Sequence, residues 1–229
     1  YCVKMTLNKN IIKNELEDSL GILDISEYSR GDTLHPSLAT GSYCWQTTLS
    51  RKIDFNGVGL HSGNGVKVSI KPSKEDTGIT FIRTDLNGDI KKRKIKANYL
   101  FVSDTSLCTT IENEYGIKVS TIEHIMAAFN GSGIDNAEIE LDNIEVPIMD
   151  GSSLPFLNLI EEAGITQQPS KRKILKILQK VEVKEDNKTC SINPSNGFDF
   201  ITEIDFDSLA VGKQSAALSI ENYGFKDFA

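Results

Sequence analysis

Residues 120–143 read STIEHIMAAFNGSGIDNAEIELDN, and two hydrophobic periods follow one another within this stretch. In its first half, apolar side chains recur every three or four positions, which predicts a helix over 121–130 with one buried face. In its second half, apolar and polar residues alternate, which predicts a strand with Ile139 and Leu141 directed inward. A helix followed at once by a half-buried strand predicts a sheet that packs against helices. The predicted buried face of the helix consists of Ile122, Ile125, Met126 and Phe129.

The same patterns extend outward from this stretch in both directions. In VKVSIKP, apolar residues from Val66 to Ile70 alternate with polar ones, as in a half-buried antiparallel strand. A second helix is predicted to begin with Ser153 as its N-cap and to end at Gly164. Residues 46–167 are therefore predicted to form an α+β domain, a two-layer structure of sheet and helices. Further antiparallel strands are predicted in TTLSRKIDF, GITFIRTDL, SLCTTIEN and YGIKVS.

The regions on either side of this domain differ from it in pattern. Residues 1–45 show weak periodicity and many turn formers, so we expect a poorly ordered N-terminal extension with one helical turn near 12–20. ITQQPSKRK, at 165–173, is expected to be a polar connector at a domain boundary. Residues 168–229 are predicted to form a β-rich unit that is shorter than a usual domain.

The charge balance and the scarcity of cysteine exclude several classes of protein. With 25 Lys and Arg against 32 Asp and Glu, the net charge of −7 argues against nucleic-acid binding and against an anionic membrane surface. No apolar run approaches the roughly 18 residues of a membrane span, and the N-terminus lacks the pattern of a signal peptide. The chain begins with Tyr1, so we expect its natural start to lie elsewhere. The four cysteines form no CxxC pair, which suits a reducing compartment.

Glu123 and His124, at the start of the predicted helix, admit two interpretations. In the first, Ser120 and Glu123 form a capping box and His124 is a solvated histidine. In the second, His124 is a zinc ligand and Glu123 takes a proton from a zinc-bound water. Both side chains are predicted to lie away from the buried face, over Ala127 and Ala128. A catalytic zinc site needs about three protein ligands, whereas the chain has three histidines in all and neither HExxH nor HxxxD.

Other candidate residues also have purely local explanations. His61 lies in the glycine-rich GVGLHSGNG between predicted strands, either as an incidental turn residue or at the mouth of a pocket. Asp150 is interpreted as structural, because its Asp-Gly turn precedes a helix cap. Cys108 lies in an alternating stretch without a base beside it in sequence, so a nucleophilic role has little support.

Taken together, several of these stretches resemble one family. GVGLHSG, TGITFIRTDL, VSDTSLCTTI, STIEHIMAA, GIDNAEIELDNIEVPIMDGSS and PFLNLIEEAG occur in the order and at the spacing of the UDP-3-O-acyl-N-acetylglucosamine deacetylases. These zinc amidohydrolases commit Gram-negative bacteria to lipid A synthesis. The resemblance is strong over 46–167, weaker from 168 to 220, and absent from 1–45. It implies two similar α+β domains with facing helical layers and an active site at their junction, the second domain being only partly present.

The resemblance also implies an activity and individual roles. The protein would remove the N-acetyl group from UDP-3-O-(3-hydroxyacyl)-N-acetylglucosamine in the cytoplasm, as a monomer when complete. Glu123 would be the general base and His124 a zinc ligand. Substrate contacts are implied for His61 near the sugar nucleotide, for Leu107 and Cys108 near the acyl-chain passage, and for Asp205 and Phe206 near the uracil.

The rest of the family's metal site is not found in this sequence. In the family, two further zinc ligands come from an H-x-x-x-D helix, a histidine acts as general acid and a threonine stabilises the oxyanion, and none of these is present. We therefore expect a copy truncated before the end of its second domain, with the remaining zinc ligands in the part that follows. The alternative is a non-catalytic remnant or a nucleotide-sugar-binding fragment without a complete metal site.

Overall fold

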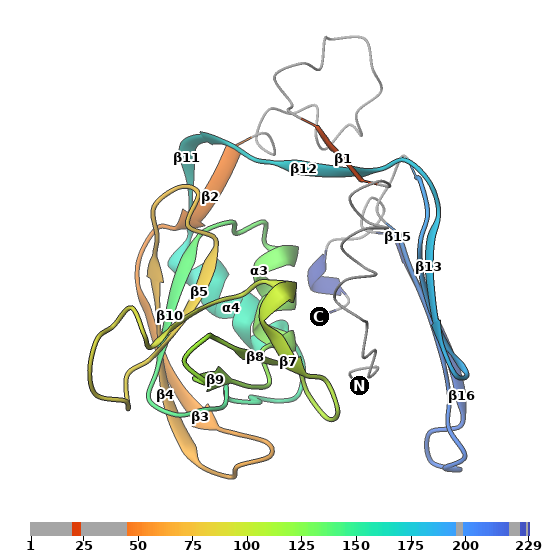
Figure 1. Ribbon diagram of the computed structural model, residues 1–229, viewed down its shortest axis with the longest axis horizontal. Coiled ribbons are helices and arrows are strands. Elements are labelled where there is room, and N and C mark those ends of the chain that lie inside the picture. The colour runs from red at the N-terminus through yellow and green to blue at the C-terminus, as the bar shows by residue number, and fades with distance from the viewer. Residues whose placement is uncertain (1–19, 24–44, 196–198, 220–224, 228) are drawn as a thin grey trace.

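The computed structural model describes residues 20–23, 45–195, 199–219, 225–227 and 229. Its largest described sheet has five strands and lies on the left in Figure 1. In spatial order the strands are β3 (Ile53–Val58), β4 (Gly65–Pro72), β10 (Ala137–Leu141), β5 (Ile79–Arg83) and β6 (Lys94–Lys96). Neighbouring strands are antiparallel except β10 and β5, which are parallel. The expectation of antiparallel strands is wrong for that pair. A long connection separates β5 from β10 in sequence, and such a connection permits parallel pairing.

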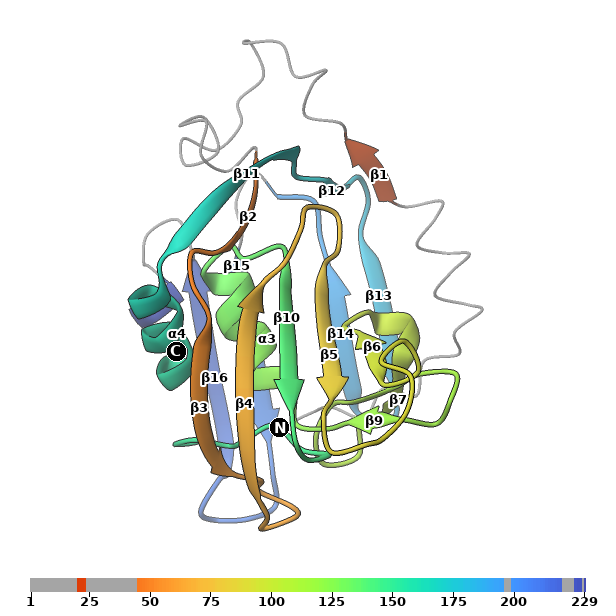
Figure 2. The ribbon, with the colours of Figure 1, turned by 90° about the vertical axis from the view of Figure 1, so that its left-hand side faces the viewer.

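Two helices, α3 (Glu123–Gly131) and α4 (Leu154–Ala163), cover one face of this sheet. Figure 2 looks onto the opposite face, with the helices behind the strands. The residues predicted to point inward from β4 and β10 are all buried. The predicted α+β class and its two layers are therefore confirmed. These inward residues are Val66, Val68, Ile70, Ile139 and Leu141.

Helix α4 begins and ends where the sequence predicts. Ser153 occupies the N-cap position, and Gly164 ends the helix with a φ of 75°, which favours glycine. The buried face of α4 includes Phe156, whose ring meets that of Phe55 on β3 edge-on, with centroids 5.9 Å apart. Burial of this face against the sheet stabilises the layer, since a fully buried phenylalanine contributes about 1.5–3 kcal/mol.

The predicted polar connector over 165–173 is a strand instead. β11 (Ile165–Lys171) pairs antiparallel with β2 (Trp45–Leu49). Buried amides explain its polarity, because Asn136 donates its Nδ2 hydrogens to Gln46 Oε1 at 2.9 Å and to Gln168 Oε1 at 2.7 Å. The one buried residue of β11 is Gln168, so the strand has no apolar alternation and the sequence pattern could not reveal it.

A small three-stranded sheet lies beside α3, and a short 3-10 helix, η3 (Tyr99–Phe101), leads into it. Of the predicted strand SLCTTIEN, only Thr110–Glu112 is extended and paired, so Leu107 and Cys108 lie in an irregular loop. The strands of this sheet are β7 (Val102–Asp104), β8 (Thr110–Glu112) and β9 (Lys118–Val119).

The last third of the chain is built of two-stranded pairs, as predicted for a β-rich unit. β12 (Ile174–Ile177) pairs with β1 (Leu20–Leu23), and two hairpins follow. The expected helical turn near 12–20 and most of the expected extension over 1–45 lie outside the described residues. The hairpins are β13 (Val181–Glu185) with β14 (Lys188–Ile192) and β15 (Asp199–Asp205) with β16 (Lys213–Ser219), and a 3-10 helix, η4 (Phe225–Asp227), lies near the C-terminus.

Among the helices in the described part of the chain, none is both long and apolar enough to cross a membrane.

Candidate active site

The start of α3 places Glu123 and His124 as the first two residues of the helix. The predicted capping box is wrong, because Ile122 is the N-cap and makes no side-chain cap bond. Thr121 adopts a φ of 57°, and this turn separates Ser120 from the helix. Ser120 instead bridges to Glu145 and donates its hydroxyl to the Ile144 carbonyl oxygen at 3.4 Å.

The Glu123 carboxylate does not take part in a capping box and accepts a hydrogen bond from another segment instead. Its Oε2 accepts a hydrogen bond from the Thr109 backbone N–H at 3.0 Å. The carbonyl oxygen of Thr109 in turn accepts from Ile122 N–H at 3.4 Å. The backbone of Thr109 therefore holds the helix start at two points, and one carboxylate oxygen of Glu123 is fixed by an amide.

The face of α3 that carries Glu123 and His124 is narrower than predicted. Both side chains are half-buried, opposite a stripe that includes the fully buried Ile125 and Phe129. Ala127 is half-buried as well, but Ala128 is completely buried and belongs to the core. The prediction that both alanines lie on the open face is therefore wrong for Ala128, because the buried stripe is wider than the apolar spacing indicates.

Asp150 lies in the turn before α4, close enough to His124 for their charges to interact. Its Oδ1 accepts from the Ser152 N–H at 2.9 Å and from the Ser152 hydroxyl at 2.8 Å. These bonds from Ser152 lower the pKa of Asp150, and the positive charge of His124 lowers it a little further. The structural interpretation of Asp150 agrees with this local turn.

His61 lies in the exposed turn between β3 and β4, which is a hairpin as predicted. Its backbone N–H donates to Glu145 Oε1 at 3.0 Å, and the N–H of Ser62 donates to Glu145 Oε2 at 2.8 Å. Gly59 starts this turn, and a Cβ added there would collide with the Glu145 carboxylate. The turn is therefore wrapped around a buried carboxylate, and the His61 imidazole extends from it into solvent.

Glu145 is a buried residue of this region that the sequence analysis did not single out. Its side chain is 2% exposed, and Oε1 also accepts from the Thr121 hydroxyl at 3.0 Å. Burial alone would raise the pKa of Glu145, but hydrogen bonds from His61, Ser62 and Thr121 lower it below its usual value. A signal was present in the sequence, since IEVPI places a glutamate inside an apolar run.

The other predicted substrate residues fall into two groups. Leu107, which is 77% exposed, and Cys108 directly precede Thr109, so they share a loop with the amide that holds Glu123. Asp205 and Phe206 lie at the end of β15, in a hairpin that Figure 1 shows well apart from α3. The structure thus brings Leu107 and Cys108 near Glu123, whereas Asp205 and Phe206 lie elsewhere.

The residues that the structure describes do not by themselves fit a zinc site. Among them, no group of three or more His, Cys, Asp or Glu side chains could hold a metal ion. His124 supplies a single imidazole, and zinc in catalytic sites takes about three protein ligands.

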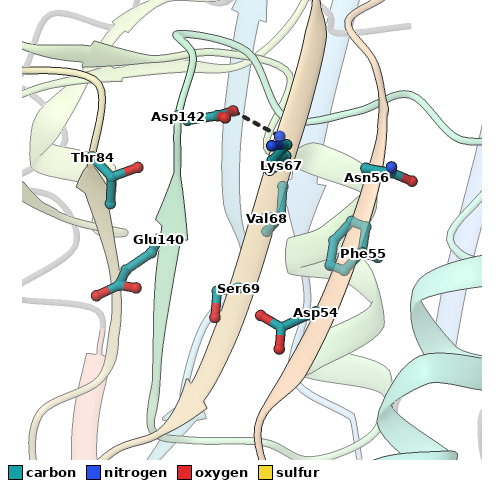
Figure 3. Close-up of a pocket in the computed structure, with 9 residues that line it drawn as sticks. All are labelled: Asp54, Phe55, Asn56, Lys67, Val68, Ser69, Thr84, Glu140 and Asp142. Atoms are coloured by element: carbon teal, nitrogen blue, oxygen red, sulfur yellow. Dashed lines mark hydrogen bonds between the residues drawn. The ribbon is translucent and has the colours of Figure 1, made fainter.

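A shallow groove lies on the outer face of the sheet, away from the helices (Figure 3). In this groove the Lys67 backbone N–H donates to Asp142 Oδ1 at 2.7 Å, and Glu140 forms an ion pair with Lys71. None of the predicted site residues lines it, so it is separate from the candidate active site. Its lining consists of Asp54, Phe55, Asn56, Lys67, Val68, Ser69, Thr84, Glu140 and Asp142.

Comparisons with known proteins match the part of the chain that contains the candidate active site. The profile of the family described as UDP-3-O-acyl N-acetylglycosamine deacetylase matches residues 46–228. The UDP-3-O-acyl-N-acetylglucosamine deacetylase of Neisseria meningitidis serogroup C / serotype 2a is 45% identical over 179 residues, which cover 78% of this chain and 58% of the relative. The protein of that name from Pasteurella multocida is 46% identical over 168 residues, covering 73% and 54%. The chain thus spans somewhat more than half the length of these relatives.

Proposed function

The chain belongs to the UDP-3-O-acyl N-acetylglycosamine deacetylase family, and on that premise we propose that a protein of full family length containing it is a deacetylase of lipid A biosynthesis. Its substrate is UDP-3-O-(3-hydroxyacyl)-N-acetylglucosamine, and its products are acetate and the free amine. The observation that carries this proposal is the Glu123–His124 pair, half-buried at the start of α3 and free of the capping role that would explain it otherwise.

In the proposed reaction, Glu123 is the general base. A water attacks the acetamide carbon, a new C–O bond forms, and Glu123 takes the proton that the water loses. The C–N bond then breaks, and the amine leaves with a proton from an acid outside the described residues. The Thr109 amide fixes one carboxylate oxygen of Glu123 at 3.0 Å, so the base is oriented before substrate binds.

We assign His124 as one ligand of a catalytic zinc ion. Zinc in such a site polarises the carbonyl and lowers the pKa of its water to about 7. Because one imidazole does not hold zinc in a catalytic site, the other ligands must come from outside the described residues.

The remaining substrate contacts are proposed as the family resemblance implies them. His61 contacts the sugar nucleotide, Leu107 and Cys108 lie along the acyl chain, and Asp205 and Phe206 lie at the uracil. The same resemblance leads us to propose a cytoplasmic monomer.

The test of the proposed base is Glu123→Ala in a protein of full family length. We expect kcat to fall about 100- to 10,000-fold, which is the usual contribution of a general base, while zinc content stays nearly unchanged. The matched control is Glu138→Ala, which removes a half-buried carboxylate paired with Lys94 on the outer face of β10. Equal activity of Glu123→Ala and the parent would rule out the base role.

The second candidate is a binding fragment without catalysis, and the single donor His124 favours it for the chain alone. Metal analysis of the purified 229-residue chain tests whether the chain alone is such a fragment. We expect less than one tightly held zinc per chain, because one imidazole supplies one ligand. One tightly bound zinc with deacetylase activity would instead eliminate the fragment hypothesis.

A further inference from the structure

The segment that contains Glu145 runs between the two parts of the candidate active site. On one side, Ser120 N–H donates to the Ile144 carbonyl at 2.9 Å, and Val146 N–H donates to the Ser120 carbonyl at 3.1 Å. On the other side, Ile148 N–H donates to the Val58 carbonyl at the end of β3, at 3.0 Å. Residues 144–148, which we name the central strap, therefore join the end of β3 to the approach to α3.

The Glu145 side chain makes the same connection as the backbone of the strap. Its two oxygens accept from the amides of His61 and Ser62 in one turn, and Oε1 accepts from the Thr121 hydroxyl in the other. The turn of His61 and the turn before Glu123 and His124 thus share one carboxylate, and nearly all of its surface is removed from solvent.

The chemistry of this site requires an anion rather than a neutral group. The donors are amides and a hydroxyl that point to both oxygens at once, at 2.8–3.0 Å. A carboxylate offers acceptors on both oxygens, whereas a carboxamide offers one acceptor oxygen and places an NH₂ group against the remaining donor. Hydrogen bonds to a charged acceptor are also about twice as strong as bonds between neutral groups.

The backbone on both sides is adapted to this carboxylate. Thr121 is β-branched and yet has a φ of 57°, a left-handed conformation that such residues rarely adopt. A conformation of this kind is unfavourable and persists only when the surroundings hold it. On the other side, Gly59 leaves the space that Glu145 fills. The bond to the Thr121 hydroxyl therefore holds the strained turn from which α3 starts.

We propose that Glu145 is a positioning residue of the active site, which fixes the His61 turn to the start of α3 and so sets where His61, Glu123 and His124 stand relative to one another. It acts through backbone amides and through Thr121, so the side chains of the three site residues stay available to substrate and metal. This role rests on the proposed function, because the positions that it fixes matter only if these residues act together.

The test compares three variants of the 229-residue chain by nuclear magnetic resonance. Glu145→Gln keeps the shape but removes one acceptor, and Thr121→Val removes only the hydroxyl donor. The control is Gln168→Ala, which removes a buried side chain that bonds to Asn136 and Ser73 in the seam between β2 and β11. For each variant, the measurements are hydrogen exchange at the amides of His61 and Ser62, and the ring signals of His61 and His124.

We expect Glu145→Gln to accelerate exchange at one of the two amides at least about tenfold, since that amide loses its charged acceptor. The ring signals of His124 should shift in both Glu145→Gln and Thr121→Val. They should stay unchanged in Gln168→Ala, even where that control loses as much stability as the other two variants. If the site signals of the first two variants match those of the control, the proposal is overturned. Failure of both variants to fold would also overturn it, because Glu145 would then be needed for the fold as a whole.

A kinetic measurement adds the link to catalysis. In a protein of full family length, Glu145→Gln should lower kcat about 10- to 100-fold, as expected for a displaced catalytic group, with less change in KM. If the parent protein lacks deacetylase activity, the proposed function fails, while the resonance measurements still decide whether Glu145 positions the site. If Glu145→Gln retains full kcat, the positioning role is contradicted even where the deacetylase activity is present.

Discussion

Thr121 shows how a single backbone conformation decides which role a neighbouring side chain can play. The S-x-x-E pattern of Ser120 and Glu123 predicts a capping box, and a helical path through the intervening residues would have produced one. A φ of 57° at Thr121 turns the chain instead, and Glu123 bonds to the Thr109 amide. Positive φ at a β-branched residue has no signature in sequence, because it depends on a distant partner, here Glu145.

The ionisation of Glu145 gives a prediction at the residue scale. Its pKa in the folded protein is lowered, so the stability it contributes is fully present above its unfolded pKa of about 4.3 and is lost as pH falls through the folded pKa. Glu145→Gln should therefore reduce the free energy of unfolding by about 2 kcal/mol at pH 7 and by progressively less below about pH 4.

Urea unfolding of the parent and of Glu145→Gln, in steps from neutral to acidic pH, measures this difference. The nearby imidazole of His61 is common to both proteins. A difference that stays constant over the whole range would show that Glu145 has the same pKa in the folded and the unfolded protein, which contradicts the lowered pKa.

At the scale of single elements, the sequence predicts what local chemistry controls. Ser153 and Gly164 lie at the two ends of α4 as predicted, although the Ser153 side chain makes no cap bond. The end at Gly164 is a local effect, because its positive φ favours a residue without a Cβ. The alternation in β4 and β10 is equally local and equally correct. The polar strand β11 was missed, since Gln168 is buried only because Asn136 on a distant segment satisfies it.

The C-cap of α4 provides a prediction for one element. Gly164 has a φ of 75° and a ψ of 163°, a region that is almost reserved for glycine, and an added Cβ would lie 3.3 Å from Ser50 Oγ. Gly164→Ala should lower the free energy of unfolding by about 1–3 kcal/mol. The control is Gly65→Ala at the start of β4, where an added Cβ meets nothing within 4 Å.

Urea unfolding at neutral pH compares the two glycine variants, and Gly65→Ala should stay within about 0.5–1 kcal/mol of the parent. Equal losses in both would mean that the backbone at Gly164 tolerates a side chain.

At the scale of the whole molecule, the layers follow from the sequence but the connections between distant segments do not. The apolar faces of the helices and strands require a two-layer arrangement. Nothing local specifies that β10 inserts between β4 and β5, or that β2 pairs with the distant β11. The same limit applies to the candidate site, where Glu123 and His124 could be recognised and the contact between Glu145 and the His61 turn could not.

Arg172 is the clearest test of these distant connections. Just after β11, its guanidinium donates to both carboxylate oxygens of Asp135 at 2.8 and 2.7 Å and to the Gly133 carbonyl at 2.6 Å. Asp135 also accepts from the Thr47 N–H at 2.8 Å, so the loop before β10, the strand β2 and the end of β11 meet at one ion pair. Arg172→Ala leaves a largely buried carboxylate without its cation and should lower the free energy of unfolding by about 2 kcal/mol.

The matched control is Arg51→Ala, which removes an arginine whose ion pair with Glu162 is exposed on both sides. Exposed pairs contribute about 0–1 kcal/mol, so this variant should unfold almost as the parent does. If the two arginine variants lose the same stability in urea unfolding, the pair with Asp135 is no stronger than a surface contact.

The pairing of β2 with β11 also has an optical consequence. Trp45 is the single tryptophan of the chain, and it lies opposite Lys171, directly before Arg172. Its indole is half-buried at the seam, so its fluorescence emission should move to longer wavelength when β11 separates from β2. The protein therefore carries an intrinsic reporter of this one junction, and the opening of the seam can be followed in real time without any label.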